Sequence, residues 1–246
     1  MDQSTGISKM VSNLGVVPAK PLVVAVDGPA GSGKSTVCQK VCQLLGWAYV
    51  NTGSIYRAVA LLAEEQGVDL KNTEKMKSLV NQLEAQGRWD AAEGRLHIEG
   101  RDVTSLLSGT ERGRQASRIA THPQIREALL PVFRTLVMKS EASGALVDGR
   151  DIGSVVFPEA DLKIYMTASL EVRAKRRMCQ LKAQESELSH IQEQMRLRDE
   201  QDQSRAVAPL IQAEGAVLFD TTDMGEEAVA TELQALIEKK LLIELH

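Results

Sequence analysis

A glycine-rich segment near the amino terminus carries the strongest chemical signal in the sequence. It reads Gly-Pro-Ala-Gly-Ser-Gly-Lys-Ser from Gly28 to Ser35 and matches the phosphate-loop pattern G-x-x-x-x-G-K-[ST]. In that pattern backbone N–H groups surround a phosphate chain, the Lys34 side chain reaches the β- and γ-phosphates, and the Ser35 hydroxyl holds Mg²⁺. We predict that a nucleoside triphosphate is bound by Gly28, Pro29, Ala30, Gly31, Ser32, Gly33, Lys34, Ser35 and Thr36.

The loop indicates a nucleotide but does not say how the nucleotide is used. A GTP switch protein would need a guanine-reading N-K-x-D segment, and the sequence contains none. A kinase of small molecules would need a second, arginine-lined pocket, because two anions must approach each other. Residues 51–57, residues 147–153, and the set Arg198, Asp202 and Arg205 on one helical face could supply it. Taken alone, that last set fits a solvated row of charges better than a binding site.

Short apolar runs without alternation predict strands that are buried on both faces, as in a parallel sheet. Segments with helical spacing separate them, among them residues 54–66, and residues 88–103 instead predict small antiparallel hairpins. The fold class is therefore α/β, with a five-stranded parallel sheet flanked by helices and a small mixed insert. The five predicted strands are residues 22–26, 47–50, 145–147, 162–166 and 216–219.

The composition narrows the class of protein. The 246 residues carry a net charge of −4 and include only two Trp, three Tyr and three Phe, which argues against a nucleic-acid partner. The longest aliphatic run is too short to span a membrane, and three cysteines cannot make a disulfide framework. We therefore expect a cytoplasmic protein with no membrane partner. Residues 1–20 are polar and contain scattered Ser, Gly and Pro, so we expect a disordered extension there.

Together these segments resemble the bacterial cytidylate kinases (CMP kinases), a family of P-loop nucleoside monophosphate kinases. The resemblance covers about residues 22–222, and its most specific parts are residues 148–153, 155–158 and 205–209. It implies ATP-dependent phosphorylation of CMP and dCMP to CDP and dCDP, with Mg²⁺ accompanying ATP. It also implies a P-loop NTPase core of residues 21–69, 121–172 and 206–246, a CMP-binding insert of residues 70–120, and a helical lid with its return helix, residues 173–205.

The resemblance further implies which side chains bind CMP. They are Thr52, Tyr56, Arg57, Ser117, Arg126, Arg150, Asp151, Arg198, Asp202 and Arg205. They would bind the acceptor phosphate (Arg57, Arg150 and Arg205), cytosine (Ser117, Arg126 and Asp151) and the ribose hydroxyls (Arg198 and Asp202). An ionised Asp151 would accept a hydrogen bond from the cytosine amino group, whereas uracil presents an oxygen there. The catalytic residues would be Lys34, Arg150 and Arg205, which neutralise charge on the transferring phosphoryl group.

Arg173, Arg176 and Arg177 would belong to the lid that closes over ATP, and we assign Arg176 to the ATP site. One departure from the family is visible: it usually has Asp before the Thr/Ser-Gly of the second strand, whereas this chain has Asn51, which keeps hydrogen bonding but loses a charge. Two other interpretations stay open. One is a kinase for another acceptor, such as shikimate or UMP, and the other is a regulatory or scaffold P-loop protein that binds ATP without transferring phosphate. We expect a monomer, because both nucleotide sites of the family lie within one chain.

Overall fold

The computed structural model describes residues 20–244 of the chain. Its centre is a sheet in the order β2-β6-β1-β7-β8, and every neighbouring pair of strands is parallel. The predicted five-stranded parallel sheet is confirmed, while the extension expected at residues 1–20 lies, except for residue 20, outside the described residues. The strands are β1 (Leu22–Asp27), β2 (Ala48–Asn51), β6 (Gly144–Gly149), β7 (Leu162–Thr167) and β8 (Val217–Asp220).

Strands β1 and β6, which pair at the centre of the sheet, consist mostly of apolar residues that are buried on both faces. Ala25 and Val26 of β1 and Leu146 and Val147 of β6 have no exposed surface. Helices cover both faces of a parallel sheet, so its central strands need apolar side chains at every position. This is why the sequence shows apolar runs here instead of an alternation of apolar and polar residues.

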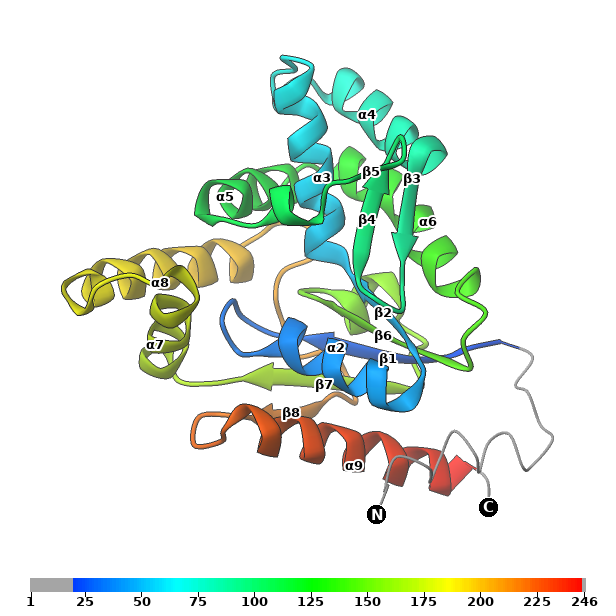
Figure 1. The fold of residues 1–246 in the computed structure, drawn as a ribbon, viewed down its shortest axis with the longest axis vertical. Coiled ribbons are helices and arrows are strands. Elements are labelled where there is room, and N and C mark those ends of the chain that lie inside the picture. The colour runs from blue at the N-terminus through cyan, green and yellow to red at the C-terminus, as the bar shows by residue number, and fades with distance from the viewer. Residues whose placement is uncertain (1–19, 245–246) are drawn as a thin grey trace.

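Helices cover the two faces of the sheet (Figure 1). On one face α2 (Lys34–Leu45) packs beside α9 (Glu226–Glu244), and both contribute to one apolar core cluster. On the other face α3 (Thr52–Glu65) and α6 (Pro123–Met138) contribute to a second cluster. The carboxyl ends of the strands are left open between these layers, where loops can build a site.

The start of α3 differs from the prediction by two residues. The sequence pattern placed the helix over residues 54–66, whereas the helix begins at Thr52, directly after β2. Asn51 causes this abrupt change, because its Oδ1 accepts a hydrogen bond from the backbone N–H of Ser54 at 2.9 Å and so caps the helix. The last residue of the strand is therefore also the cap of the helix.

Between α3 and α6 the chain forms a small antiparallel sheet, which confirms the hairpins predicted for residues 88–103. β4 (Arg95–Ile98) pairs with both β3 (Gly87–Asp90) and β5 (Arg101–Asp102). α4 (Thr73–Gln86) precedes the sheet, and α5 (Thr110–Ile119) follows it. Apolar side chains of α4 and β4 join the core cluster of α3 and α6, so this part packs firmly on the body.

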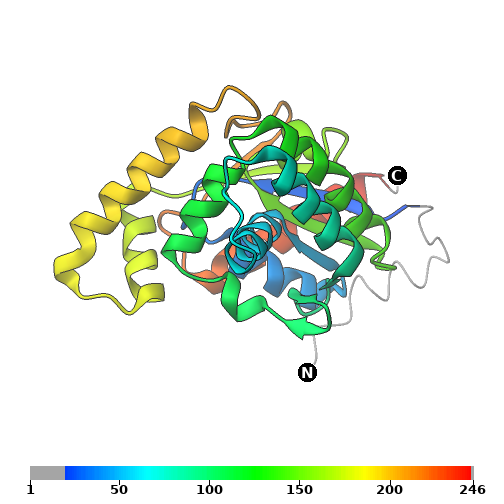
Figure 2. The ribbon, with the colours of Figure 1, turned by 90° about the horizontal axis from the view of Figure 1, so that it is seen from above.

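Two helices, α7 (Leu170–Leu181) and α8 (Leu188–Gln203), stand out from the body of the molecule (Figures 1 and 2). They pack on each other through a small apolar cluster that includes Ala174 and Ile191. This cluster is separate from the two clusters on the faces of the sheet. Because α8 ends at Gln203, Arg205 lies beyond it, and the predicted helical face is wrong for that residue. Within residues 20–244 no helix is long and apolar enough to cross a membrane.

Candidate active site

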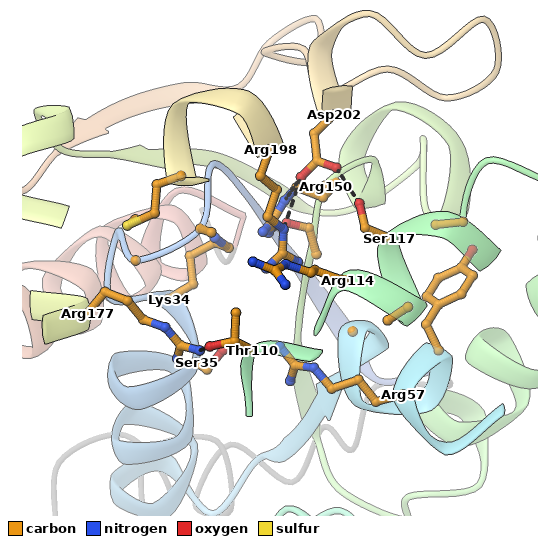
Figure 3. Close-up of a pocket in the computed structure, with 18 of the residues that line it drawn as sticks. Lys34, Ser35, Arg57, Thr110, Arg114, Ser117, Arg150, Arg177, Arg198 and Asp202 are labelled. Atoms are coloured by element: carbon orange, nitrogen blue, oxygen red, sulfur yellow. Dashed lines mark hydrogen bonds and ion pairs between the residues drawn. The ribbon is translucent and has the colours of Figure 1, made fainter. Parts of the chain in front are cut away.

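A pocket of about 620 Å³ lies at the carboxyl ends of the central strands (Figure 3). The phosphate loop, α5, and the pair of helices α7 and α8 surround it. All ten side chains predicted to bind CMP line this pocket, although they come from α3, α5, α6, the loop after β6, and α8 with the residues just after it. The fold thus brings five separate parts of the sequence to one place.

The phosphate loop connects β1 to α2 along a tight path that requires glycine. Gly28 has a φ of 148°, and a Cβ atom there would lie 1.9 Å from the backbone oxygen of Met166 in β7. Gly33, at the start of α2, has a φ of 97°. Of the nine predicted loop residues, the pocket is lined by Ala30, Gly31, Gly33, Lys34, Ser35 and Thr36, while Gly28, Pro29 and Ser32 are buried and do not line it.

The Lys34 side chain folds back onto this loop. Its Nζ donates hydrogen bonds to the backbone oxygens of Gly28 and Pro29, both at 2.8 Å. Burial, together with the positive charge of Arg150, lowers the pKa of Lys34 to about 7. A phosphate in the pocket would favour the charged ammonium form, so Lys34 is suited to respond to an incoming anion.

Asp202 gathers the basic side chains of the other half of the pocket (Figure 3). Its carboxylate accepts hydrogen bonds from Arg150 Nε at 2.9 Å and from Ser117 Oγ at 3.3 Å, and it forms an ion pair with Arg205. Arg198 Nε lies 4.0 Å from the same carboxylate. Burial opposes ionisation of Asp202, but the three arginines outweigh burial and lower its pKa.

The arginines of the pocket outnumber the carboxylates that face them. Burial, and then the nearby Arg150, lowers the pKa of Arg57, and the same two causes lower the pKa of Arg198 to about 10. Within residues 20–244 the buried Nε atoms of Arg57, Arg198 and Arg205 have no hydrogen-bond partner. Buried donors without acceptors are costly unless a ligand supplies the acceptor. The pocket therefore favours an anion with several oxygen atoms.

Arg126 and Asp151 form a buried ion pair in another corner of the pocket. The guanidinium carbon of Arg126 lies 6.0 Å from the centre of the Tyr56 ring, and that ring packs on Phe133 with 5.8 Å between centres. Arg126 therefore lies beside a pair of packed aromatic rings. A carboxylate can accept hydrogen bonds but not donate them, so this corner offers an acceptor to an amino group.

Two of the three arginines predicted to belong to a lid contact the phosphate loop from α7. Arg176 donates to the backbone oxygens of Ser32 at 3.3 Å and Thr221 at 2.7 Å, and it does not line the pocket. Arg173 donates to the backbone oxygen of Ala30 at 3.1 Å and forms an ion pair with Asp199. Arg176, which was predicted to bind ATP, therefore stabilises the loop that would hold the nucleotide.

Sequence reasoning did not single out several polar side chains of α5 that line the same pocket, namely Thr110, Arg114 and Arg118. Arg177, assigned only to the lid, extends from α7 so that its Nη2 donates to Thr110 Oγ1 at 3.4 Å (Figure 3). This contact joins α7 to α5, the helix that follows the antiparallel sheet. The spacing of Arg114, Ser117 and Arg118 on one helix could have pointed to this face.

Sequence comparisons agree with this geometry. The family model described as "Cytidylate kinase" matches residues 24–239. A cytidylate kinase from Pseudomonas aeruginosa is 44% identical over 221 residues, which cover 87% of this chain and 93% of that protein. A cytidylate kinase from Photobacterium profundum is 43% identical over 225 residues, which cover 89% of this chain and 96% of that protein.

A solved structure shares the fold at low sequence identity. An uncharacterized protein from Eubacterium ventriosum ATCC 27560 aligns with a TM-score of 0.50 and 11% identity, covering 89% of this chain and 99% of that one. This likeness concerns the fold alone. The two relatives match most of the sequence, and the family model includes every segment that lines the pocket. The chain belongs to the cytidylate kinase family.

Proposed function

We propose that this chain transfers the γ-phosphoryl group of ATP to CMP or dCMP, with ADP and CDP or dCDP as products. The observation that carries the proposal is that all ten side chains predicted to bind CMP line one pocket together with the phosphate loop. Membership of the cytidylate kinase family supports the same assignment. The two anionic substrates would meet between Lys34 and the arginines, in line for transfer.

The donor nucleotide would occupy the phosphate loop together with Mg²⁺. Ser35 lines the pocket from the start of α2, and Asp148 lines it from the end of β6. Within residues 20–244 no group of three or more His, Cys, Asp or Glu side chains could hold a metal by itself. This set of donors fits a Mg²⁺ ion that arrives on the nucleotide, with Ser35 as its protein ligand. When bound, Mg²⁺ would neutralise charge on the β- and γ-phosphates.

The acceptor phosphate would lie among Arg57, Arg150 and Arg205. Guanidinium groups match phosphate oxygens with paired N–H donors. The Nε atoms of Arg57 and Arg205 lack a partner within the described chain, so a phosphate can supply the missing acceptors. Lys34, Arg150 and Arg205 would then offset charge on the transferring group, whose loose transition state spreads it over oxygens. A phosphate acceptor is already anionic and needs no strong general base.

The nucleoside part of CMP would be read by the remaining side chains. The cytosine amino group would donate to Asp151, which Arg126 holds in place, with Ser117 nearby. Uracil would place an oxygen against that carboxylate, and two acceptors repel each other. Arg198 and Asp202 would hold the ribose hydroxyls. Because Asp202 also accepts a hydrogen bond from Arg150, the ribose and phosphate sites would share one carboxylate.

The division into a core, a CMP-binding insert of residues 70–120 and a lid of residues 173–205 belongs to the same proposal. α7 and α8 pack through their own apolar cluster, which supports movement of the lid as one piece. Its closure would exclude water and complete the site only when CMP is present, which limits hydrolysis of ATP. Since every side chain invoked belongs to one chain, we propose a monomer that works in the cytoplasm without nucleic-acid or membrane partners.

A panel of acceptors tests the proposed function. The protein is mixed with ATP and Mg²⁺, then with CMP, dCMP, UMP, AMP or shikimate, and release of ADP is followed. We expect rapid turnover with CMP and dCMP, and its loss in Lys34→Met. Turnover of another acceptor without turnover of CMP would contradict the proposal. Binding of ATP with no acceptor-dependent ADP release would instead favour a scaffold protein.

A further inference from the structure

Three polar side chains meet at the carboxyl end of β2 and β6, beside the phosphate loop. Tyr49 and Asn51 lie on β2, and the parallel register places Asn51 next to Asp148 on β6. Side chains two residues apart on a strand share a face, so Tyr49 lies on the same side as Asn51 and Asp148. Tyr49 and Asp148 are each 3% exposed. A buried hydroxyl, an amide and a carboxylate therefore form one corner of the sheet.

The direction of each hydrogen bond in this corner is fixed by one backbone group. The N–H of Ser54 donates to Asn51 Oδ1 at 2.9 Å, so the amide nitrogen Nδ2 faces the other way. Nδ2 donates to the Tyr49 hydroxyl oxygen at 2.9 Å and to Ser35 Oγ at 3.2 Å. The Tyr49 hydroxyl has a single proton, which it donates to Asp148 Oδ2 at 2.9 Å.

Tyr49 is suited to remain a donor. A tyrosine hydroxyl is protonated at neutral pH, so Tyr49 keeps the proton that it donates to Asp148. Tyr49 does not line the pocket, whereas Ser35, Asn51 and Asp148 do. Its hydroxyl can therefore affect a bound nucleotide only through these neighbours.

We propose that Tyr49 is a positioning residue of the donor site, which fixes the carboxylate of Asp148 directly and the hydroxyl of Ser35 through Asn51. The inference rests on the proposed function, because Ser35 is the side chain assigned there to the Mg²⁺ of the donor nucleotide. A misplaced hydroxyl or carboxylate beside the phosphates would weaken binding of the magnesium-loaded nucleotide. Binding of the nucleotide alone depends on the loop backbone and would change little.

The arrangement requires residue 51 to donate to Tyr49. An aspartate at that position would accept from the hydroxyl instead, so two carboxylates would compete for one proton and Asp148 would lose its donor. A buried polar group that loses its partner carries the full cost of desolvation. Tyr49 and Asn51 are therefore matched to each other, because the amide can donate to the hydroxyl and a carboxylate cannot.

The test is a double-mutant cycle made of Tyr49→Phe, Asn51→Asp and the double variant. Calorimetric titration with ADP, once with Mg²⁺ and once with EDTA, gives two dissociation constants for each protein, and their ratio measures the gain from Mg²⁺. We expect Tyr49→Phe to reduce this gain about fivefold, as for the loss of one hydrogen bond, with ADP binding in EDTA nearly unchanged. Asn51→Asp should also change the gain from Mg²⁺. We expect this change to be about fivefold less favourable with Tyr49 present than in the Tyr49→Phe background.

The cycle removes effects that are unrelated to the pairing. The added negative charge of Asn51→Asp acts in both backgrounds and cancels, and aspartate still caps α3. Tyr165→Phe is the matched control, because the hydroxyl of Tyr165 in β7 forms no hydrogen bond within residues 20–244 and its removal should leave the gain unchanged. Thermal unfolding confirms that each variant is folded.

Additive effects of the two substitutions would overturn the proposal. So would an equal loss of ADP affinity with and without Mg²⁺, which would indicate general loosening of the loop. The titrations use no acceptor and no turnover. A failure of the cycle therefore leaves CMP phosphorylation standing, and a failure of CMP phosphorylation is detected separately by the acceptor panel.

Discussion

Arg150 and Asp202, which lie 52 residues apart in the sequence, are joined by a hydrogen bond of 2.9 Å from Nε to the carboxylate. Arg150 follows β6, and Asp202 lies in the last turn of α8, so this bond connects the carboxyl end of an inner strand to α8. The same carboxylate pairs with Arg205. A shift of α8 therefore moves two arginines that we propose to hold the acceptor phosphate.

Removal of the Asp202 carboxylate should destabilise the folded protein. Asp202→Ala removes the ion-pair partner of Arg150 and Arg205 in a largely buried site, and we expect the free energy of unfolding to fall by about 3 kcal/mol. Inorganic phosphate should restore part of this loss, because it binds the folded state and replaces the missing negative charge. Urea unfolding with and without phosphate measures both effects.

The matched control for this prediction is Glu193→Ala on the same helix. Glu193 pairs with Arg196, but both side chains are about half exposed, with 54% and 44% of their surface accessible. Exposed pairs contribute little to stability, so this change should have a small effect that phosphate does not alter. Equal losses in the two variants, or no protection of Asp202→Ala by phosphate, would show that Asp202 is not the centre of an anion site.

The preference for cytosine over uracil should depend on Asp151. Asp151→Ala removes the proposed acceptor for the cytosine amino group, and we expect kcat/KM for CMP to fall about 10- to 100-fold. The loss with UMP should be much smaller, because uracil has no amino group to donate there. The ratio of the two kcat/KM values is the useful measurement, since any general damage from the unpaired Arg126 affects both substrates. A proportional loss for CMP and UMP would mean that Asp151 does not read the base.

The sheet and much of the pocket could be predicted from the sequence because their signals are local. Residues 22–26 form an apolar run that must be buried on both faces, and the phosphate-loop pattern follows it directly. The segments that resemble cytidylate kinases then identified side chains that the fold places in one pocket. A strand, a loop and a helix start are each set by neighbours in the chain.

The partners of these side chains could not be predicted, because they come from distant segments. No local pattern indicates that Asp202 accepts hydrogen bonds from both Arg150 and Ser117. Nor does one indicate that the Tyr49 hydroxyl donates to Asp148 on the neighbouring strand. The end of α8 at Gln203 was also missed, since a residue spacing of three or four continues to fit a helix beyond its last turn. Tertiary packing decides where such an element stops.

A change at Arg205 should weaken the use of CMP without weakening the binding of ATP. Arg205→Ala removes a guanidinium that pairs with Asp202 and whose Nε lacks a partner within the described residues. We expect the KM for CMP to rise about tenfold or more, as for the loss of a charge-assisted hydrogen bond, while the affinity for ATP stays near normal. Arg196→Ala, an exposed arginine on α8, serves as the control. Loss of ATP binding would refute the placement of Arg205 at the acceptor.

Binding of the donor nucleotide should be coupled to protonation of Lys34. The pKa of Lys34 is lowered to about 7, so in the free protein much of this side chain is neutral at about pH 8. Phosphate oxygens stabilise the ammonium form and raise its pKa again, so binding must take up a fraction of a proton from the buffer. A carboxylic acid whose pKa fell on binding would instead release a proton. The uptake by Lys34 should shrink as the pH falls below 7, where Lys34 is already charged.

Calorimetry of ADP binding in buffers with different ionisation enthalpies measures this uptake. The phosphates of the nucleotide titrate as well, but they do so equally in Lys34→Met, so the difference between the two proteins isolates the lysine. We expect a clear dependence on the buffer at about pH 8 in the unchanged protein and its absence in the variant. Identical buffer dependence in both proteins would mean that Lys34 is fully charged before the nucleotide arrives, and that the carbonyl oxygens of Gly28 and Pro29 stabilise the ammonium more than burial opposes it.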